Sequence, residues 1–415
     1  MKRVLLLLPT TSYRNDDFLA AAKKLEVEIV GVENYCHRLA PLWGMGPIQS
    51  VPFDQPEVAV TQVLAALGRK PDAVLAVDDS GLELAALLRE RLHLPGNTAA
   101  AVRLTRDKLA FRRLLQSRDL NCPDFYHLGN DVQAATLLPL LQFPVVVKAR
   151  RLSASRGVVR ADTPHAYAQA VLWVRGIQVK ADRDAARLGL VVESFIAGRE
   201  HALEGLLEDG QLRVLALFDK PDPLDGPYFE ETLYVTPSRL PQATQDEIAQ
   251  TVQRACELAG LSRGPIHAEM RVNEQGVWLL EIAARSIGGL CGRTLRHALG
   301  ISLEELILRH ALDRPLPQTQ PGEASGVMMI PIPGRGIFLG AQNLDSALQV
   351  AGISDIQITA SPGQLIAPPP EGASYLGFIF AHGMSPHAVE SSLRLAHQRL
   401  VFEIQADIPV NQARA

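Results

Sequence analysis

Short apolar runs alternate with helical patterns over the first hundred residues, and this alternation limits the fold more than any other feature of the chain. Runs that fit buried strands occupy residues 4–9, 26–32 and 72–79. Strands separated by helices pair in parallel, so the pattern predicts a small doubly wound α/β sheet. The first run is followed by TTSYRND and not by G-x-G-x-x-G, which disfavours a nicotinamide dinucleotide.

The composition predicts a globular protein of two to four domains. The chain has 415 residues, of which 47% are hydrophobic and 21% charged. Its net charge of −4 leaves no basic stripe, so nucleic acid is not expected as a partner. The apolar run at residues 4–8 is too short for a leader or a membrane span and fits a buried strand. Scattered cysteines without metal-ligand spacing predict reduced thiols in a cytoplasmic protein: Cys36, Cys122, Cys256 and Cys291.

Two helices are predicted in the middle of the chain from their caps and apolar periodicity. The first covers residues 243–260, with Thr244 as the N-terminal residue of a capping box. The second covers residues 302–312 and begins in the same way at Ser302.

A segment rich in proline, glycine and polar residues, 313–326, predicts a domain boundary. Beyond it, strands are expected near residues 326–332 and 375–381. A helix capped by Ser385, with Pro386 in its first turn, is expected to follow them.

Two glutamates lie within apolar surroundings on either side of a predicted hairpin turn. Residues 264–285 read as two strands joined by a three-residue loop, 274–276. In that register Glu269 falls opposite Glu281, about 5 Å away across the ladder. A two-residue loop would place them on opposite faces. A solvated hairpin is the simpler interpretation, but the apolar flanks of Glu281 favour an internal strand.

Two carboxylates at this distance repel each other unless a proton or a cation lies between them. The oxygen ligands favour Mg²⁺, with phosphate oxygens completing its shell. Arg285, on the same predicted face, adds a cation suited to bidentate contact with phosphate or carboxylate. These residues predict a phosphoryl-transfer site.

A second group of residues suits the phosphates of a nucleotide, although the Walker loop is absent from the sequence. Lys148 closes a buried strand, and a small-residue loop at 153–157 precedes the next strand. Such a loop can donate backbone N–H groups and hydroxyls to phosphate oxygens while the ammonium group neutralises them. A surface lysine and an ordinary loop are the alternatives, and either feature alone is weak.

Five segments resemble those of the ATP-grasp ligases, in the family's order, over about 180 residues: TRDKLAFRRLL, VVVKARRLSASRGV, VVESFIAGRE, HAEMRV and LLEIAAR. The resemblance implies ATP and Mg²⁺, or Mn²⁺ in its place, as cofactors, with Glu269 and Glu281 as metal ligands. It implies contacts to the phosphates, adenine or ribose by Lys108, Lys148, Ser153, Ser155, Gly157, Glu193, Ile196 and Glu200.

The resemblance also implies a fold in three parts, of mixed α+β and α/β class. A Rossmann-like domain is expected at 1–100 and an ATP-grasp domain at 101–313, with a mobile flap at about 146–190. The remainder, 324–415, resembles the C-terminal domain of the L-amino acid ligases.

Details of the motifs point to the same branch, which forms dipeptides. Ala283 stands where many ATP-grasp enzymes have a metal-binding asparagine, and E-x-A-A-R is the pattern of the L-amino acid ligases. Their E-x-x-H motif near the amino-acid substrate corresponds to Glu231 and Tyr234 here, and tyrosine is not a cation near neutral pH. Gly289 replaces a bulkier residue of some relatives, which suggests a larger substrate pocket.

The resemblance implies an ATP-dependent ligase that converts a substrate carboxylate, held by Arg285, into an acyl phosphate and joins it to an amine. It also implies a homodimer as the family's usual assembly. The alternatives are an ATP-grasp enzyme of nucleotide or cofactor biosynthesis, including a carboxylase, and a non-catalytic ATP-binding regulator. Three residues near the motifs can be either structural or part of the site: His267, Lys220 and Cys291.

Overall fold

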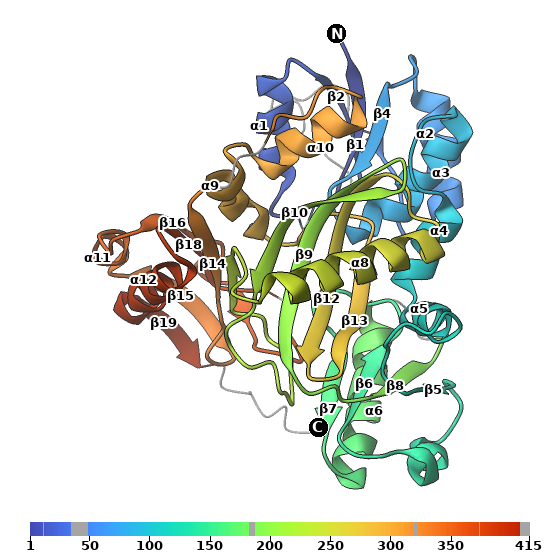
Figure 1. Cartoon of the computed structure of the whole chain (residues 1–415), viewed down its shortest axis with the longest axis vertical. Coiled ribbons are helices and arrows are strands. Elements are labelled where there is room, and N and C mark those ends of the chain that lie inside the picture. Colours follow the sequence, from blue (N-terminus) through green and yellow to red (C-terminus); the bar gives the residue numbers. More distant parts are fainter. Residues whose placement is uncertain (11, 35–48, 182–186, 319–321, 373, 407–415) are drawn as a thin grey trace, which may run out of the picture. The chain divides into compact units, whose positions relative to one another are not determined.

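The chain forms two compact units, each assembled from segments that are distant in the sequence (Figure 1). The computed structural model describes residues 1–10, 12–34, 49–181, 187–318, 322–372 and 374–406. The first unit contains Met1–Asp124, Ile196–Phe218 and Ser238–Gly322. The second contains Phe125–Phe195, Asp219–Pro237 and Glu323–Ala415.

The first unit begins with the predicted parallel sheet, which has the strand order β3-β2-β1-β4. Val4–Leu8 of the central strand are at most 1% exposed, because this strand is covered on both faces. The elements of this region are β1 (Arg3–Leu8), α1 (Asn15–Lys24), β2 (Glu28–Glu33), β3 (Gln49–Ser50), α2 (Pro56–Ala66), β4 (Ala73–Ala76), η2 (Asp79–Gly81) and α3 (Leu82–Leu92).

Four further strands of the first unit are neighbours in the order β13-β12-β9-β10, within a sheet of eight strands. Helix α8 packs against β13 and lies across this sheet in Figure 1. The elements are α4 (Ala99–Arg106), α5 (Lys108–Gln116), β9 (Arg199–Glu208), β10 (Gln211–Asp219), α8 (Gln242–Ala259), β12 (Gly264–Asn273), β13 (Gly276–Ala283), η4 (Cys291–Thr294), α9 (Leu295–Leu299) and α10 (Leu303–Ala311).

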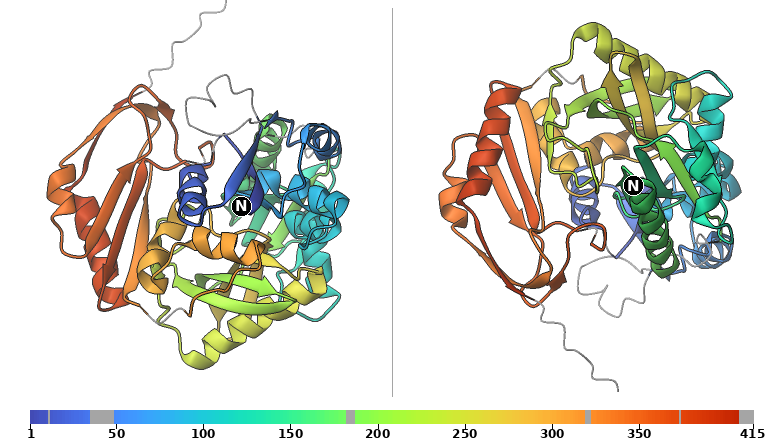
Figure 2. Two further views of the ribbon diagram at one scale, coloured as in Figure 1. Left: turned by 90° about the horizontal axis from the view of Figure 1, so that it is seen from above. Right: turned by 90° about the horizontal axis from the view of Figure 1, so that it is seen from below.

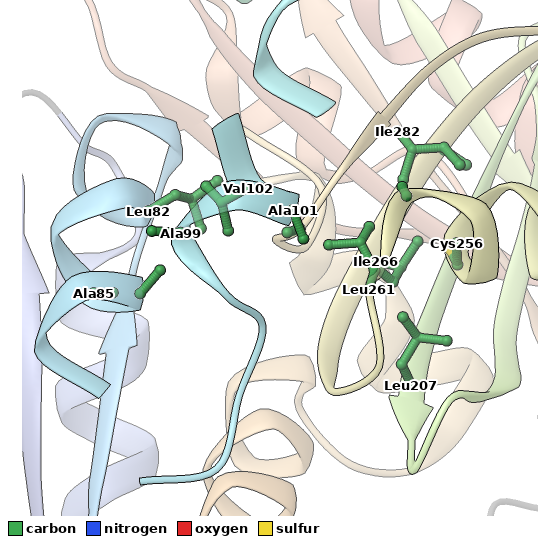
Figure 3. Packing of buried hydrophobic residues seen from close by; sticks show 14 of the residues in the cluster. Leu82, Ala85, Ala99, Ala101, Val102, Leu207, Cys256, Leu261, Ile266 and Ile282 are labelled. Carbon is green, nitrogen blue, oxygen red and sulfur yellow. The ribbon is translucent and has the colours of Figure 1, made fainter. Parts of the chain in front are cut away.

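One apolar core connects the two sheets of the first unit (Figure 3). Ala101 and Val102 of α4 lie between Leu82 of α3 and Ile266 of β12. Because this core is shared, the N-terminal sheet and the strands that carry Glu269 and Glu281 belong to one packed body.

Of the two N-terminal caps predicted for the central helices, one is confirmed and the other is wrong. Ser302 caps α10 by accepting a hydrogen bond from the backbone N–H of Glu305 at 3.2 Å, as predicted. The cap predicted at Thr244 is wrong, because α8 already begins at Gln242 after Pro241. The Pro241 carbonyl accepts from the backbone N–H of Thr244 at 3.0 Å and takes the capping role.

The second unit contains an antiparallel sheet with the order β5-β8-β6-β7, and α6 packs on β6 and β7. This confirms the predicted strand, loop and strand around Lys148. The elements are β5 (Phe125–Leu128), η3 (Ala134–Leu140), β6 (Val145–Ala149), β7 (Val158–Ala161), α6 (Pro164–Ala181) and β8 (Leu190–Ser194).

The C-terminal part of the second unit has two further groups of strands, β11-β14-β18-β16 and β17-β15-β19. Helix α12 packs on β14 and β18, as the red helix against orange strands shows in Figure 2. Ser385 caps this helix as predicted. The elements are β11 (Leu233–Thr236), β14 (Ala324–Ile330), β15 (Gly336–Gln342), α11 (Leu344–Leu348), β16 (Ile353–Ile358), β17 (Leu365–Ile366), β18 (Gly377–Gly383), α12 (Pro386–Arg399) and β19 (Val401–Ala406).

Candidate active-site residues

Glu269 of β12 and Glu281 of β13 are direct partners across the strand pair, as predicted. Directly opposed residues of neighbouring strands project from the same face of a sheet, so the two carboxylates share one side. Their side chains are 17% and 33% exposed, respectively. They are therefore neither part of the apolar core nor fully solvated.

The hairpin has the predicted pairing of Glu269 with Glu281, but its loop length and strand regularity differ from the prediction. Asn273 pairs with Gly276, so the loop has two residues and the three-residue loop is wrong. The Asn273 side chain accepts from the backbone N–H of Gln275 at 2.9 Å, which stabilises the tight turn. A register shift at Glu269 then leaves Leu280 as the extra residue of a bulge. The bulge restores the pairing that a two-residue loop alone would lose.

Two basic side chains lie beside the acidic pair. The Lys108 Nζ atom is 4.0 Å from Glu281 Oε2, and His267 Nε2 is 3.2 Å from Glu269 Oε1. Lys108 is the first residue of α5, which Asp107 caps. Paired carboxylate oxygens are hard donors of the kind that Mg²⁺ prefers, so the donor set fits the ion that the family uses.

Arg285 lies just beyond the end of β13 and pairs with Asp79 of η2. The Nε atom is 2.8 Å from Asp79 Oδ2. Burial opposes both charges, but the partner charges outweigh it, so the pKa of Arg285 is raised and the pKa of Asp79 is lowered. The guanidinium is thus held as a fixed cation. Asp79 follows a parallel strand, and its pairing with Arg285 was not predicted.

Glu204 of β9 is a second residue that sequence reasoning missed. It is fully buried, and its Oε1 atom lies 2.7 Å from both His267 Nδ1 and the backbone nitrogen of Ile287. Burial raises the pKa of Glu204. Burial lowers the pKa of His267, but its hydrogen bonds to Glu204 and Glu269 outweigh this effect and raise that pKa to about 9. The signal in the sequence was a glutamate inside the apolar run ALEGLL.

The segment expected to hold the nucleobase and ribose is organised in part by Arg271 of β12. Arg271 Nη1 donates to the Ile196 carbonyl at 2.9 Å, and its Nε atom is 3.3 Å from Glu200 Oε2. Arg271 and Glu200 are buried. Two of the predicted nucleotide contacts, Ile196 and Glu200, are therefore anchored by Arg271, a residue of the HAEMRV segment to which no role was assigned from the sequence.

In the second unit, Lys148 of β6 and Glu193 of β8 form an ion pair on neighbouring strands. The Lys148 Nζ atom is 2.7 Å from Glu193 Oε2, and the two side chains are 12% and 1% exposed. The structure therefore brings together the predicted phosphate lysine and the predicted adenine contact. It also shows that Lys148 is not a surface lysine with a solvated ammonium group.

The loop between β6 and β7 has an unusual backbone. Ala154 and Ser155 both have positive φ, at 56° and 53°, and Gly157 has φ 64°. Non-glycine residues with positive φ are uncommon and concentrate in loops that bind ligands or are otherwise constrained. This conformation is consistent with a loop that turns backbone N–H groups toward an anion. The roles of Ser153, Ser155 and Gly157 stay a prediction.

Glu231 and Tyr234 belong to a small cluster in the second unit with Lys220. Glu231 Oε1 lies 2.6 Å from Lys220 Nζ and accepts from the Tyr234 hydroxyl at 2.7 Å. Lys220 also lies 5.0 Å from the centre of the Tyr234 ring. Lys220 is therefore buried and paired with Glu231, directly after the end of β10.

The cysteines do not gather into a site in the described parts of the chain. Cys122, Cys256 and Cys291 form no disulfide among the described residues, and Cys256 and Cys291 are buried. Cys36 lies outside the described residues. Among the described residues, no helix has the length and apolar character needed to cross a membrane.

Two family models match this chain. One is described as an ATP-grasp domain and matches residues 141–294. The other is described as L-amino acid ligase C-terminal domain 2 and matches residues 328–405.

Solved and curated proteins agree with these matches. The crystal structure of an L-amino acid ligase from Bacillus licheniformis superposes with a TM-score of 0.80 at 26% identity, covering 98% of this chain and 99% of that one. Carnosine synthase 1 of Gallus gallus is 30% identical over 71% of this chain and 33% of its own length. A D-alanine–D-alanine ligase of Verminephrobacter eiseniae is 27% identical over 56% of this chain and 70% of its own length.

The chain thus contains an ATP-grasp domain and an L-amino acid ligase C-terminal domain, and it is similar over almost its whole length to a solved L-amino acid ligase. It spans about a third of the length of the carnosine synthases that it matches.

Proposed function

We propose that this chain joins the carboxylate of one amino acid to the amine of another, with cleavage of ATP to ADP and phosphate. The observation that carries the proposal is the direct pairing of Glu269 with Glu281, with Lys108 beside the pair. Opposed carboxylates next to a lysine form an environment for a metal-bound polyphosphate. A non-catalytic ATP-binding regulator would not need such a set.

The nucleotide is proposed to contact the residues that the ATP-grasp motifs predict. In this proposal Lys108 and Lys148 neutralise its phosphates, and Ser153, Ser155 and Gly157 donate to phosphate oxygens. Glu193, Ile196 and Glu200 contact adenine and ribose. When bound, Mg²⁺ on Glu269 and Glu281 would supply charge neutralisation at the transferring phosphoryl group.

The proposed reaction has two steps. In the first, an oxygen of the substrate carboxylate attacks the γ-phosphorus, the bond to the β–γ bridging oxygen breaks, and ADP leaves. In the second, the amine nitrogen attacks the acyl carbon, the bond to the phosphate oxygen breaks, and the nitrogen loses a proton to solvent. Arg285 orients the carboxylate and then stabilises the oxyanion, because Asp79 holds its guanidinium in place.

The substrates are proposed to be small molecules, and the amino-acid class is supported by the match to the L-amino acid ligase C-terminal domain. Glu231 and Tyr234 are proposed to contact the amino-acid substrate. The same match argues against a carboxylase of nucleotide or cofactor biosynthesis. The domain division at 1–100, 101–313 and 324–415, the flap at about 146–190 and the homodimer belong to the same proposal.

Phosphate release across a matrix of amino-acid pairs tests the proposal. We expect ATP-dependent phosphate release with at least one pair, together with a product whose mass equals the two amino acids minus water. Hydroxylamine in place of the amine should trap the activated carboxylate as a hydroxamate. Failure to release phosphate or form hydroxamate with any carboxylate of a broad panel would contradict a ligase function.

A further inference from the structure

A fully buried carboxylate, Glu204, lies on β9, the strand next to the one that carries Glu269. Glu204 has no exposed surface and sits opposite His267 in the β9–β12 register. One of its oxygens, Oε1, lies within hydrogen-bonding distance of both His267 and the Ile287 backbone N–H. The other, Oε2, has no hydrogen-bond partner among the described residues. A buried charged group held in this way is costly to maintain, which calls for an explanation.

One of these contacts leads to the predicted metal ligands. The imidazole of His267 reaches Glu204 through Nδ1 at 2.7 Å and Glu269 through Nε2 at 3.2 Å. The ring therefore connects a fully buried carboxylate with a half-buried one. Such a bridge fixes the rotamer of the outer carboxylate.

The other contact leads to Arg285. Ile287 is two residues beyond Arg285, and its backbone N–H donates to Glu204. Its carbonyl accepts from Arg14 Nη1 at 3.0 Å, and Arg14 pairs with Glu304 at 2.9 Å with both side chains 3% exposed. Both polar groups of Ile287 are thus held by buried charged side chains. The segment that carries Arg285 has little freedom to move.

We propose that Glu204 is a positioning residue that sets the placement of Glu269 and of Arg285 together, from a single carboxylate oxygen. The inference rests on the proposed function, in which Glu269 binds the metal and Arg285 binds the carboxylate. Glutamine at position 204 keeps the size of the side chain, and its carbonyl oxygen can still accept from both donors, so the substitution removes the negative charge and not the acceptor. Hydrogen bonds to a carboxylate are about twice as strong as those to a neutral amide, so the loss of charge weakens the hold on both His267 and the Ile287 backbone.

The test compares Glu204→Gln with Glu305→Gln in the full chain. Glu305 of α10 is also a buried acid, and it pairs with Lys24 of α1 and Arg309 of α10 and not with the residues around Glu269 and Arg285. Loss of a residue that orients a metal ligand typically weakens metal binding about 10- to 100-fold. We expect E204Q to raise the half-saturating Mg²⁺ concentration at least about tenfold at saturating ATP. We expect E305Q to leave it unchanged.

A second readout needs no turnover. Calorimetry of ADP binding, with and without Mg²⁺ and without amino acids, should show that E204Q loses most of the Mg²⁺-dependent gain in affinity while metal-free ADP binding persists. If the wild-type chain releases phosphate with no amino-acid pair, the proposed function fails, but this calorimetric arm still decides the role of Glu204.

His267→Asn separates the two contacts and covers the case in which E204Q does not fold. It removes the link to Glu269 and keeps the hydrogen bond from Ile287 to Glu204. We expect this variant to raise the half-saturating Mg²⁺ concentration and to leave the KM for the carboxylate substrate near the wild-type value. We expect E204Q to raise both quantities. Unchanged Mg²⁺ dependence in the folded variants, or an equal shift in E305Q, would overturn the proposal.

Discussion

Arg285 and Asp79 form an ion pair that joins the ends of two strands from different sheets. Arg285 follows β13 and Asp79 follows β4, so the N-terminal sheet supplies the group that orients the arginine. The side chains are 11% and 23% exposed, and their charges are therefore only weakly screened. An arginine fixed in this way is suited to stabilise a negative charge that develops during the reaction.

Replacing Asp79 with asparagine should lower kcat by at least about tenfold, which corresponds to about 1.4 kcal/mol of transition-state stabilisation. The amide keeps the shape but removes the charge that fixes the guanidinium, so the KM for ATP should change little. Steady-state phosphate release measures both quantities. Asp72→Asn, which breaks the exposed pair with Lys2, is the control. Equal kcat in both variants would show that Asp79 does not orient Arg285.

Single residues differ in how well they could be found from the sequence. Glu269 and Glu281 could be predicted because they lie in one hairpin, where the periodicity and apolar flanks limit the register. The roles of Asp79 and Glu204 could not be predicted, since their partners come from segments that only tertiary packing brings together. Lys220 was ambiguous because its partner Glu231 lies across an irregular loop.

At the scale of elements, the β12–β13 hairpin contains two departures from the expected geometry that compensate each other. The loop is one residue shorter than predicted, and a bulge at Leu280 adds one residue on β13. Loop length can be argued from glycine and asparagine, but a bulge has no comparably strong local signal. The predicted pairing was therefore correct although the predicted loop was not.

The loop between β6 and β7 should be sensitive to its backbone conformation. Gly157→Ala places a Cβ at φ 64°, 3.1 Å from the Ala149 Cβ. We expect a loss of about 1 kcal/mol or more in the free energy of unfolding and a several-fold higher KM for ATP. Urea denaturation and phosphate release measure these effects.

Gly176→Ala on α6 is the matched control for Gly157→Ala. Its added Cβ would meet no atom within 4 Å, and alanine in a helix interior gains about 0.5–1 kcal/mol over glycine. If Gly157→Ala has the same free energy of unfolding and the same KM for ATP as Gly176→Ala, the loop tolerates other backbone conformations.

His310 of α10 should make stability depend on pH. Burial, with Arg263 nearby, lowers its pKa, and its Nε2 atom has no hydrogen-bond partner in the described parts of the chain. The unfolded chain, with an imidazole pKa of about 6.5, then binds more protons than the folded chain just below that pH. The free energy of unfolding must therefore fall as the pH drops below about 6.5.

His310→Gln removes this titration. Between pH 7.5 and 5 the wild type should lose more free energy of unfolding than H310Q, as measured by urea denaturation. Parallel pH profiles would mean that His310 is protonated equally easily in both states.

At the scale of the whole molecule, the residues expected to bind ATP are divided between the two units. Lys108, Glu200, Glu269 and Glu281 belong to the first, and Lys148, Glu193 and the loop at 153–157 belong to the second. The order of the motifs predicted this family from sequence because each motif is a local pattern. The choice of amino acids depends on side chains such as Tyr234 and Gly289, which differ from the family pattern and carry no local signal of what they bind.

The central claim is that a carboxylate is phosphorylated beside Glu269 and Glu281, and isotope transfer tests it most directly. An amino-acid substrate with ¹⁸O in its carboxylate should transfer one ¹⁸O atom to each phosphate released, because the oxygen that attacks phosphorus leaves with it. Glu281→Gln should abolish this transfer, whereas Glu274→Gln in the exposed turn of the same hairpin should not. Released phosphate without the label, or full transfer in Glu281→Gln, would contradict the account.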